Sequence, residues 1–255
     1  MQLLTSEVLL LDVVDLAEYD RIVSFLTPEQ GLLKGVAKGA RRKYSRFAGQ
    51  LQPLAKVEAT WFFKEGRELV RLSSLDLIRP VEPLYRDLET LLTGGYLADH
   101  ILEFAQENEE SRRMYRLLDS TIEAMLQGLS LPLVTRYFEV WMLRLAGVFP
   151  VPVECPRCGG SMLERGAALP HGDGALVCRS CHVGGDDELV APEALAVLLR
   201  TRFASLAQMA ADTPDPAALA GVEAICRTVR RSFLQRELRS YRVLQQALGG
   251  LTPSS

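Results

Sequence analysis

Four cysteines form two hooks of the kind that holds a metal ion. Cys155, Cys158, Cys178 and Cys181 stand in a Cys-x2-Cys-x19-Cys-x2-Cys pattern. Each Cys-x-x-Cys turn points two thiolates at one spot, and two turns separated by a loop of this length can close tetrahedrally on zinc. Glycines such as Gly159 and Gly184 follow the hooks and allow the positive φ that a backbone needs to wrap around a metal. The pattern predicts a zinc site.

The alternatives to zinc are two disulfides or four buried thiols. Disulfides need an oxidising compartment, and the stretch from Met1 to Asp12 lacks the features of an export signal, so we expect a cytoplasmic protein. A four-thiolate shell leaves no open position for water, whereas catalytic zinc usually keeps one. We therefore expect Zn2+ as a structural cofactor, with His182 beside Cys181 as an alternative ligand.

Cations gather in one short stretch, although the net charge of the chain is −3. The stretch comprises Lys34, Lys38, Arg41, Arg42, Lys43, Tyr44, Arg46 and Phe47 and contains no acid. This combination suits single-stranded nucleic acid, because cations follow the phosphates while aromatic faces stack on unpaired bases. The stretch is therefore a candidate DNA-binding site. The alternative is a solvated basic loop that Phe47 anchors to the rest of the fold.

A second group of arginines lies near the C-terminal end of the sequence. It comprises Arg227, Arg230, Arg231, Arg239 and Arg242. These side chains could form a second basic surface for phosphates. They could equally be the solvated side of a helix whose apolar stripe is buried.

The chain lacks the common signatures of catalysis. It has no Walker-type Gly-x4-Gly-Lys loop, no Gly-x-Gly-x-x-Gly fingerprint and no Gly-x-Ser-x-Gly elbow. Its three histidines leave little material for a Ser-His-Asp arrangement. No apolar stretch approaches the ~20 residues that a membrane span needs. We expect a protein that is not an enzyme and does not cross a membrane.

Hydrophobic patterning changes near Pro80. Before it, five short runs with glycine-bearing bends predict strands. These runs are Val8–Val14, Arg21–Leu26, Gly31–Gly39, Lys56–Phe63 and Glu68–Ile78. Five such strands suit a small closed barrel, for which an oligonucleotide-binding (OB) fold is the obvious candidate.

After Pro83, apolar residues recur at three and four positions and predict helices. The predicted helices cover Leu84–Ala105, Tyr115–Leu126, Leu133–Leu145, Pro192–Ala210 and Ala217–Leu248, the first and last as one helix or two. Gly94 and Gly95 either bend the first of them or let another segment approach closely. We predict an α+β multidomain chain, with an N-terminal five-stranded OB-fold β-barrel at 1–80 and an all-α domain at 81–255. The zinc module is inserted at about 153–185 of that domain.

A family resemblance rests mainly on the basic stretch. Residues 26–42 read LTPEQGLLKGVAKGARR, which resembles the LTPxxGLxxGVAKGARR pattern of RecO, a family of bacterial recombination mediators. A second resemblance runs from Tyr137 to Gly147 and leads into the first cysteine hook at Cys155 and Cys158. The order of barrel, helices, zinc module and helices also agrees with the family over nearly the whole chain.

The resemblance implies a DNA-binding recombination mediator of the RecF pathway. Such a protein binds single- and double-stranded DNA, anneals complementary strands and helps to load RecA onto DNA coated by single-strand-binding protein (SSB). The implied partners are RecR, RecF and the acidic C-terminal tail of SSB, and the implied location is the cytoplasmic nucleoid. Some members lack the cysteines, so the zinc is implied to support structure. The competing hypothesis is a zinc-stabilised interaction scaffold in which DNA contact is incidental.

Overall fold

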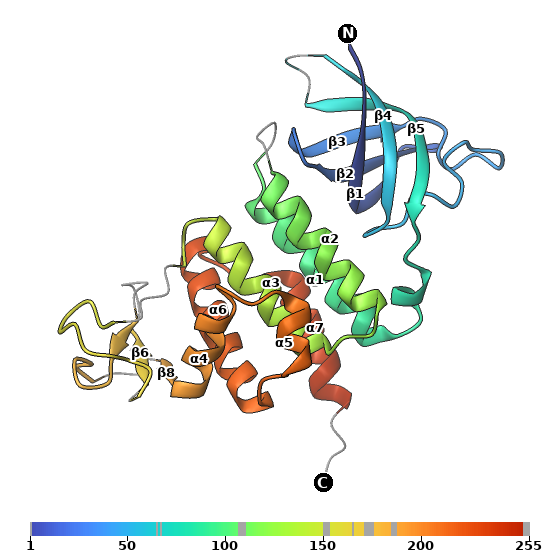
Figure 1. Cartoon of the computed structure of the whole chain (residues 1–255). Coiled ribbons are helices and arrows are strands. Elements are labelled where there is room, and N and C mark those ends of the chain that lie inside the picture. The colour runs from blue at the N-terminus through green and yellow to red at the C-terminus, as the bar shows by residue number, and fades with distance from the viewer. Residues whose placement is uncertain are drawn as a thin grey trace. The chain divides into compact units, whose positions relative to one another are not determined.

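The computed structural model describes residues 2–64, 66, 68–106, 111–149, 154–164, 166–170, 176–184 and 188–251. Within these residues the chain has the predicted fold class, a five-stranded N-terminal barrel followed by helices and a cysteine-bearing insert (Figure 1). The chain forms two compact units, Met1–Leu126 together with Val243–Ser255, and Gln127–Arg242. Among the described residues, no helix combines the length and hydrophobicity needed to cross a lipid bilayer. The predicted boundary near residue 80 stays a prediction.

The barrel follows the strand order β1-β2-β3-β5-β4 and is closed. Its strands are β1 (Gln2–Leu16), β2 (Asp20–Thr27), β3 (Gly31–Ala37), β4 (Lys56–Phe63) and β5 (Leu69–Arg79). β3 and β5 pair in parallel, and the other neighbours pair antiparallel. This is the five-stranded barrel of an OB fold, as the sequence predicted.

Alternating side chains fill the barrel. Along β4, Val57, Ala59 and Trp61 are buried while Glu58 between them is exposed, because successive residues of a strand point to opposite faces. The Trp61 ring packs edge-on against Phe25 of β2, with 5.6 Å between the ring centroids. The interior is therefore occupied by large apolar groups in contact.

β1 is shared between two neighbours along its length. Its first part pairs with β4, from Gln2 opposite Phe63 to Leu9 opposite Lys56. Its second part pairs with β2, beginning at Leu9. Because Leu9 pairs with both strands, β2 and β4 lie on opposite edges of β1. The register shifts between Leu10 and Asp12, a bulge that lets the strand bend around the barrel.

The helical elements begin after β5. They are η1 (Glu82–Tyr85), α1 (Leu88–Phe104), α2 (Arg112–Leu126), α3 (Leu131–Leu145), α4 (Pro192–Arg200), α5 (Leu206–Ala211), α6 (Pro216–Leu234) and α7 (Arg239–Leu251). The prediction of a single helix over Pro192–Ala210 was wrong. Ser205 caps a new helix there, since its side chain accepts from the backbone of Gln208 while the Gln208 side chain accepts from the backbone of Ser205. This reciprocal capping box starts α5 and separates it from α4.

Charged groups join α2 to the barrel in the first unit. Asp119 of α2 pairs with Lys56 of β4 at 3.2 Å and with Arg79 of β5 at 2.7 Å. Lys56 also pairs with Glu7 of β1 at 2.9 Å. Burial opposes the charge of Lys56, but the hydrogen bond to Glu7 and the charge of Asp119 outweigh burial and raise the pKa of this lysine. Lys56 therefore stays charged where barrel and helix meet.

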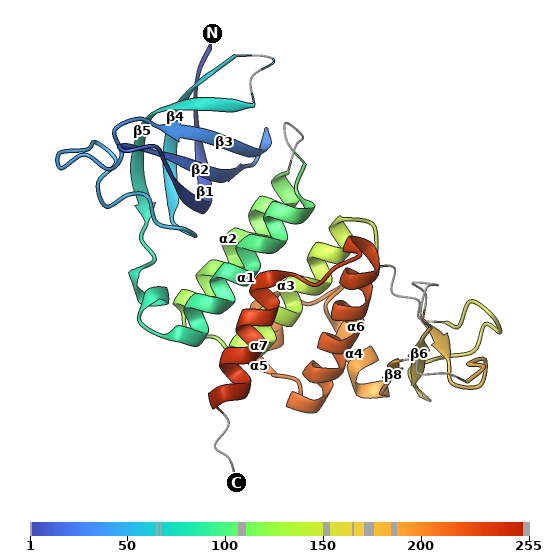
Figure 2. The ribbon, with the colours of Figure 1, turned by 180° about the vertical axis from the view of Figure 1, so that it is seen from behind.

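The second unit combines helices with a small sheet. α6 packs against both α3 and α4 (Figure 2). The sheet has the order β7-β6-β8 and consists of β6 (Ala167–Leu169), β7 (Val177–Cys178) and β8 (Glu188–Val190). Gly166 precedes it with a φ of +76°, and a Cβ there would lie 2.6 Å from the carbonyl oxygen of Val190. Only glycine fits that approach.

Gly94 and Gly95 of α1 provide a matched pair of tests. A Cβ at Gly94 would collide with the buried side chain of Leu54, whereas a Cβ at Gly95 meets nothing within 4 Å. Both Gly→Ala changes gain the same helix propensity. We expect Gly94→Ala to have a free energy of unfolding lower than that of Gly95→Ala by about 1–3 kcal/mol, the cost of overpacking. Urea unfolding of both variants measures the difference, and equal stabilities would contradict the close approach.

Candidate metal centre and nucleic-acid interface

Backbone turns shape the first cysteine hook. Glu154 and Ser161 form an isolated antiparallel bridge around it. The N–H of Cys155 donates to the oxygen of Gly160 at 2.9 Å, and the N–H of Gly159 donates back to the oxygen of Cys155 at 2.8 Å. Gly159 has a φ of +71°, so the glycine after the hook takes the conformation that the sequence suggested.

The second hook follows β7. The N–H groups of Cys181 and His182 both donate to the oxygen of Cys178, at 3.0 and 3.1 Å. Arg157 of the first hook donates to the oxygen of Cys181 at 2.9 Å. A hydrogen bond from the Arg157 side chain to the backbone of Cys181 thus joins the two hooks, in addition to the approach of their sulfur atoms.

The four cysteines converge. Their Sγ atoms all lie within 4.8 Å of one another, and among the described residues this metal-competent group consists of the cysteines, without His182. The Sγ atoms of Cys158 and Cys178 are 3.6 Å apart. A tetrahedron with Zn–S bonds of about 2.3 Å has edges of about 3.8 Å, so the spacing and the donor set fit zinc. The geometry is compatible with a structural zinc site.

Backbone donors favour the thiolate at Cys155. The N–H of Cys178 donates to its Sγ at 3.3 Å, and the N–H groups of Arg157 and Cys158 also donate toward it. These hydrogen bonds lower the pKa of the Cys155 thiol. The deprotonated form is the one that ligates a metal.

The basic loop, which we define as residues 38–47, leaves the barrel after β3 (Figure 1). Backbone contacts with the β1–β2 turn hold it. The N–H of Gly39 donates to the Asp20 carboxylate at 2.7 Å, and the N–H of Arg41 donates to the oxygen of Tyr19 at 3.0 Å. The Arg41 guanidinium pairs with Asp15 at 3.4 Å. The loop is thereby fixed at one end of the barrel.

The structure exposes most of the predicted DNA-binding side chains. Lys34, Lys38, Arg41, Arg42, Lys43, Tyr44 and Arg46 are exposed. Tyr44 has 89% of its surface accessible. Phe47 is only 1% exposed and lies under Arg46, whose guanidinium carbon is 5.0 Å from the ring centroid. In this conformation Phe47 anchors the loop, which was the alternative interpretation, and cannot stack on a base.

Tyr19 is a candidate that sequence reasoning missed. It lies in the β1–β2 turn, is 45% exposed and sits beneath the guanidinium of Arg42, 5.3 Å from the ring centroid. The β1–β2 loop is one of the two loops through which OB folds usually bind oligonucleotides. An aromatic residue within the acidic stretch Glu18–Asp20 was the available signal, but the contact with Arg42 joins segments far apart in the sequence.

The second group of arginines divides in the structure. Arg227, Arg231, Arg239 and Arg242 are exposed. Arg230 has 0% of its surface accessible and therefore cannot belong to a basic surface. Its guanidinium pairs with Glu139 of α3 at 3.3 Å and with Glu237 at 2.7 Å, and lies over the Tyr241 ring. Arginine is almost never fully buried unless it is paired with another charge. The sequence did not indicate this burial, because the partner Glu139 is remote in the sequence.

Further charges complete the buried group around Glu139. Arg136, one turn before it on α3, pairs with Glu139 at 3.0 Å and with Glu223 of α6 at 2.8 Å. The Tyr241 hydroxyl donates to Glu223 at 2.8 Å. Burial and the neighbouring Glu223 carboxylate raise the pKa of Tyr241, so the hydroxyl remains a donor. The group connects α3 and α6 inside the second unit.

Comparison with known proteins adds a consistent assignment. Sequence models described as Recombination protein O N terminal and Recombination protein O C terminal match residues 1–81 and 85–242. The chain is similar to the DNA repair protein RecO of Anaeromyxobacter sp. (strain K), with 33% identity over 226 residues, which cover 88% of this chain and 87% of that protein. It is also similar to DNA repair protein RecO of Geobacter metallireducens, with 32% identity over 200 residues, 78% of this chain and 80% of that protein. DNA repair protein RecO of Roseiflexus sp. (strain RS-1) is 29% identical over 253 residues, 98% of this chain and 88% of that protein.

Replacement of one cysteine tests the metal centre. We expect Cys155→Ser to lose bound zinc because it removes a buried thiolate from a four-sulfur shell. Metal analysis of the purified protein measures zinc per chain. Cys226→Ala is the matched control, since Cys226 is a buried thiol outside the cluster and should leave zinc unchanged. Full zinc occupancy in Cys155→Ser would refute the assignment.

Neutralising Arg230 tests the buried ion group. We expect Arg230→Gln to lower the free energy of unfolding by about 3 kcal/mol, because it leaves the carboxylate of Glu139 buried beside fewer cations. The neighbouring exposed Arg231→Gln should change stability by no more than about 0.5 kcal/mol. Chemical denaturation compares the two variants. Equal effects would contradict the burial of Arg230.

Proposed function

This chain belongs to the RecO family of DNA repair proteins, and on that premise we propose that it is a DNA-binding recombination mediator whose basic loop contacts the phosphates. Membership of the family assigns the chain to DNA repair and recombination. The observation that carries the finer proposal is the exposure of the cations of the basic loop beside two exposed tyrosines. A loop of this composition suits single-stranded DNA, and its charge also suits the duplex backbone.

The cations of the loop are available for phosphates. Among the described residues, no carboxylate forms an ion pair with Lys38, Arg42, Lys43 or Arg46. Arg42 instead lies over Tyr19, and Lys43 lies over Tyr44 at 5.5 Å from the ring centroid. A guanidinium over a ring keeps its N–H donors directed outward, where they can reach phosphate oxygens.

Strand annealing follows from this electrostatic surface without a catalytic group. Two complementary strands repel each other through their phosphates, and a cationic surface that binds both lowers the repulsion until base pairing takes over. We propose that the protein anneals strands in this way, is not an enzyme and helps to load RecA onto SSB-coated DNA. RecR, RecF and the SSB tail are the proposed partners, and the cytoplasmic nucleoid is the proposed location.

Zinc has a supporting role in this proposal. When bound, the zinc ion would cross-link the two cysteine hooks. The hooks lie in the second unit, whereas the basic loop belongs to the first. The proposed DNA contact therefore does not depend on the sulfur ligands. The alternative function is a scaffold whose basic loop meets an acidic protein surface, and the salt dependence of DNA binding separates the two.

Neutralising the loop tests the proposal. For Arg42→Gln/Lys43→Gln/Arg46→Gln, we expect weaker binding of labelled single-stranded DNA and a flatter dependence on salt. The slope of log affinity against log salt should fall by about 2, since each lost phosphate contact on a single strand removes about 0.7. Annealing of SSB-coated complementary strands should slow in parallel.

A second triple variant serves as the control. Arg227→Gln/Arg231→Gln/Arg242→Gln removes the same charge from exposed positions of the second unit. If this control loses affinity and slope while the loop variant retains both, the DNA site lies on the other arginines. If neither variant changes DNA binding, the result favours the scaffold hypothesis over the mediator hypothesis.

A further inference from the structure

The barrel is closed, but the first residues of β1 pair with a neighbouring strand on one edge only. β4 pairs with Gln2–Leu9 of β1 on one edge, whereas β2 pairs with the opposite edge only from Leu9 onward. In the part of the chain that the structure describes, that opposite edge of residues 2–8 pairs with no strand. A strand edge of this kind presents alternating N–H and C=O groups, which are complementary to another extended backbone.

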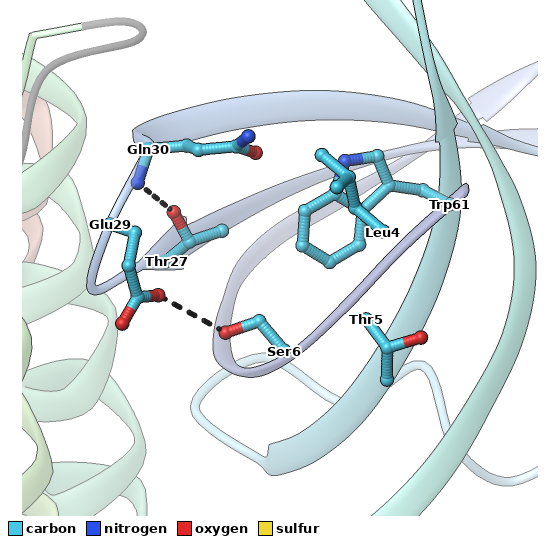
Figure 3. Close-up of a pocket in the computed structure, with 7 residues that line it drawn as sticks. All are labelled: Leu4, Thr5, Ser6, Thr27, Glu29, Gln30 and Trp61. Carbon is cyan, nitrogen blue, oxygen red and sulfur yellow. Dashed lines mark hydrogen bonds between the residues drawn. The ribbon is translucent and has the colours of Figure 1, made fainter. Parts of the chain in front are cut away.

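A pocket lies beside this edge. It has a volume of about 300 Å³ and is lined by Leu4, Thr5, Ser6, Thr27, Glu29, Gln30 and Trp61 (Figure 3). The first three residues belong to the part of β1 that pairs only with β4, and the next three belong to the end of β2 and the turn before β3. Thr27 fixes the turn by accepting from the N–H of Gln30 at 2.9 Å. The volume is at the lower end of the range for ligand sites.

Two buried polar atoms of this pocket have no partner. Trp61 is only 1% exposed, and its indole Nε1 makes no hydrogen bond. Oε1 of Gln30 is likewise buried without a donor. Figure 3 shows the Gln30 carboxamide and the indole nitrogen turned toward each other across the pocket. An unsatisfied buried donor or acceptor costs about 1–3 kcal/mol, so a group that bonds to both atoms is favoured.

The chemistry of the pocket selects its occupant. A carboxamide offers an oxygen to the indole N–H and an N–H to the glutamine oxygen. Phosphate is disfavoured, because the lining contains the exposed carboxylate of Glu29 and no lysine or arginine. The strand edge requires a backbone with its own N–H groups, which nucleic acid lacks. Both features point to an extended peptide.

We propose that β1 accepts a peptide strand from a partner protein, and that one glutamine or asparagine side chain of this strand enters the pocket between Gln30 and Trp61. Backbone hydrogen bonds to the open edge supply affinity, and the pocket supplies specificity, as in other cases of strand addition. The site is separate from the basic loop. Gln30 precedes β3 and Lys38 follows it, and the seven residues of this strand span about 23 Å. Peptide and DNA can therefore bind the same barrel together.

Nuclear magnetic resonance provides a direct test. The chain contains two tryptophans, so Trp141→Phe leaves Trp61 as the single indole signal. The probe is a short peptide of alternating threonine and valine with one central glutamine. We expect the Trp61 indole signal and the backbone amides of residues 2–6 to shift and saturate together. Trp61→Phe, which keeps a ring against Phe25, should bind the peptide about fivefold more weakly because one hydrogen bond is lost.

Two altered peptides complete the experiment. An analogue methylated on its backbone nitrogens cannot add to a strand edge and should leave all signals in place. A peptide with leucine in place of glutamine should bind the parent more weakly than the glutamine peptide does. The difference between the two peptides should shrink in Trp61→Phe, where only the hydrogen bond to Gln30 remains. The proposal is overturned if the glutamine peptide moves none of these signals, or if oligothymidylate moves the indole and the peptide does not. It is also overturned if the signals change with protein concentration alone, since a second copy then occupies the edge.

Discussion

The sharing of β1 between β2 and β4 is the constraint on which the barrel depends. Because Leu9 pairs on both edges, the sheet closes around a core that includes Phe25 and Trp61. In the closed barrel, the chain leaves the sheet on both sides of β3. After β3 it forms the basic loop, which the β1–β2 turn holds through Asp20 and Tyr19. Before β3 it forms the turn that lines the pocket. One pairing pattern therefore positions both surfaces.

Features set by local sequence were predictable. The spacing of the cysteines predicted a cluster that the structure brings together, and the run Lys56–Phe63 predicted a strand that the structure contains as β4. These predictions succeeded because a turn or a strand depends on neighbours within a few residues. The zinc ion and the DNA contacts stay predictions.

Features set by contacts between distant residues were not predictable. From the sequence, Arg230 was expected on the surface of a helix. In the structure it is buried and pairs with Glu139, which is far away in the sequence. Tyr19 became a candidate DNA-binding residue only because Arg42 packs on its ring in the structure. The sequence left two interpretations of Phe47, as a ring that stacks on bases or as an anchor of the loop. Its burial favours the anchor. The break between α4 and α5 is a different case, because the capping box of Ser205 and Gln208 is a local signal that the apolar periodicity masked. For Arg230 and Tyr19, a partner outside the local pattern determined the outcome.

The buried ions between α3 and α6 have a consequence for how the second unit can vary. Arg136, Glu139 and Glu223 join these helices without any contribution from the sulfur ligands. The cysteine-bearing insert lies between α3 and α4 in the chain and forms a sheet of very short strands of its own. The ion pairs between α3 and α6 involve no residue of this insert, so a change in its length or in its sulfur atoms would leave them in place.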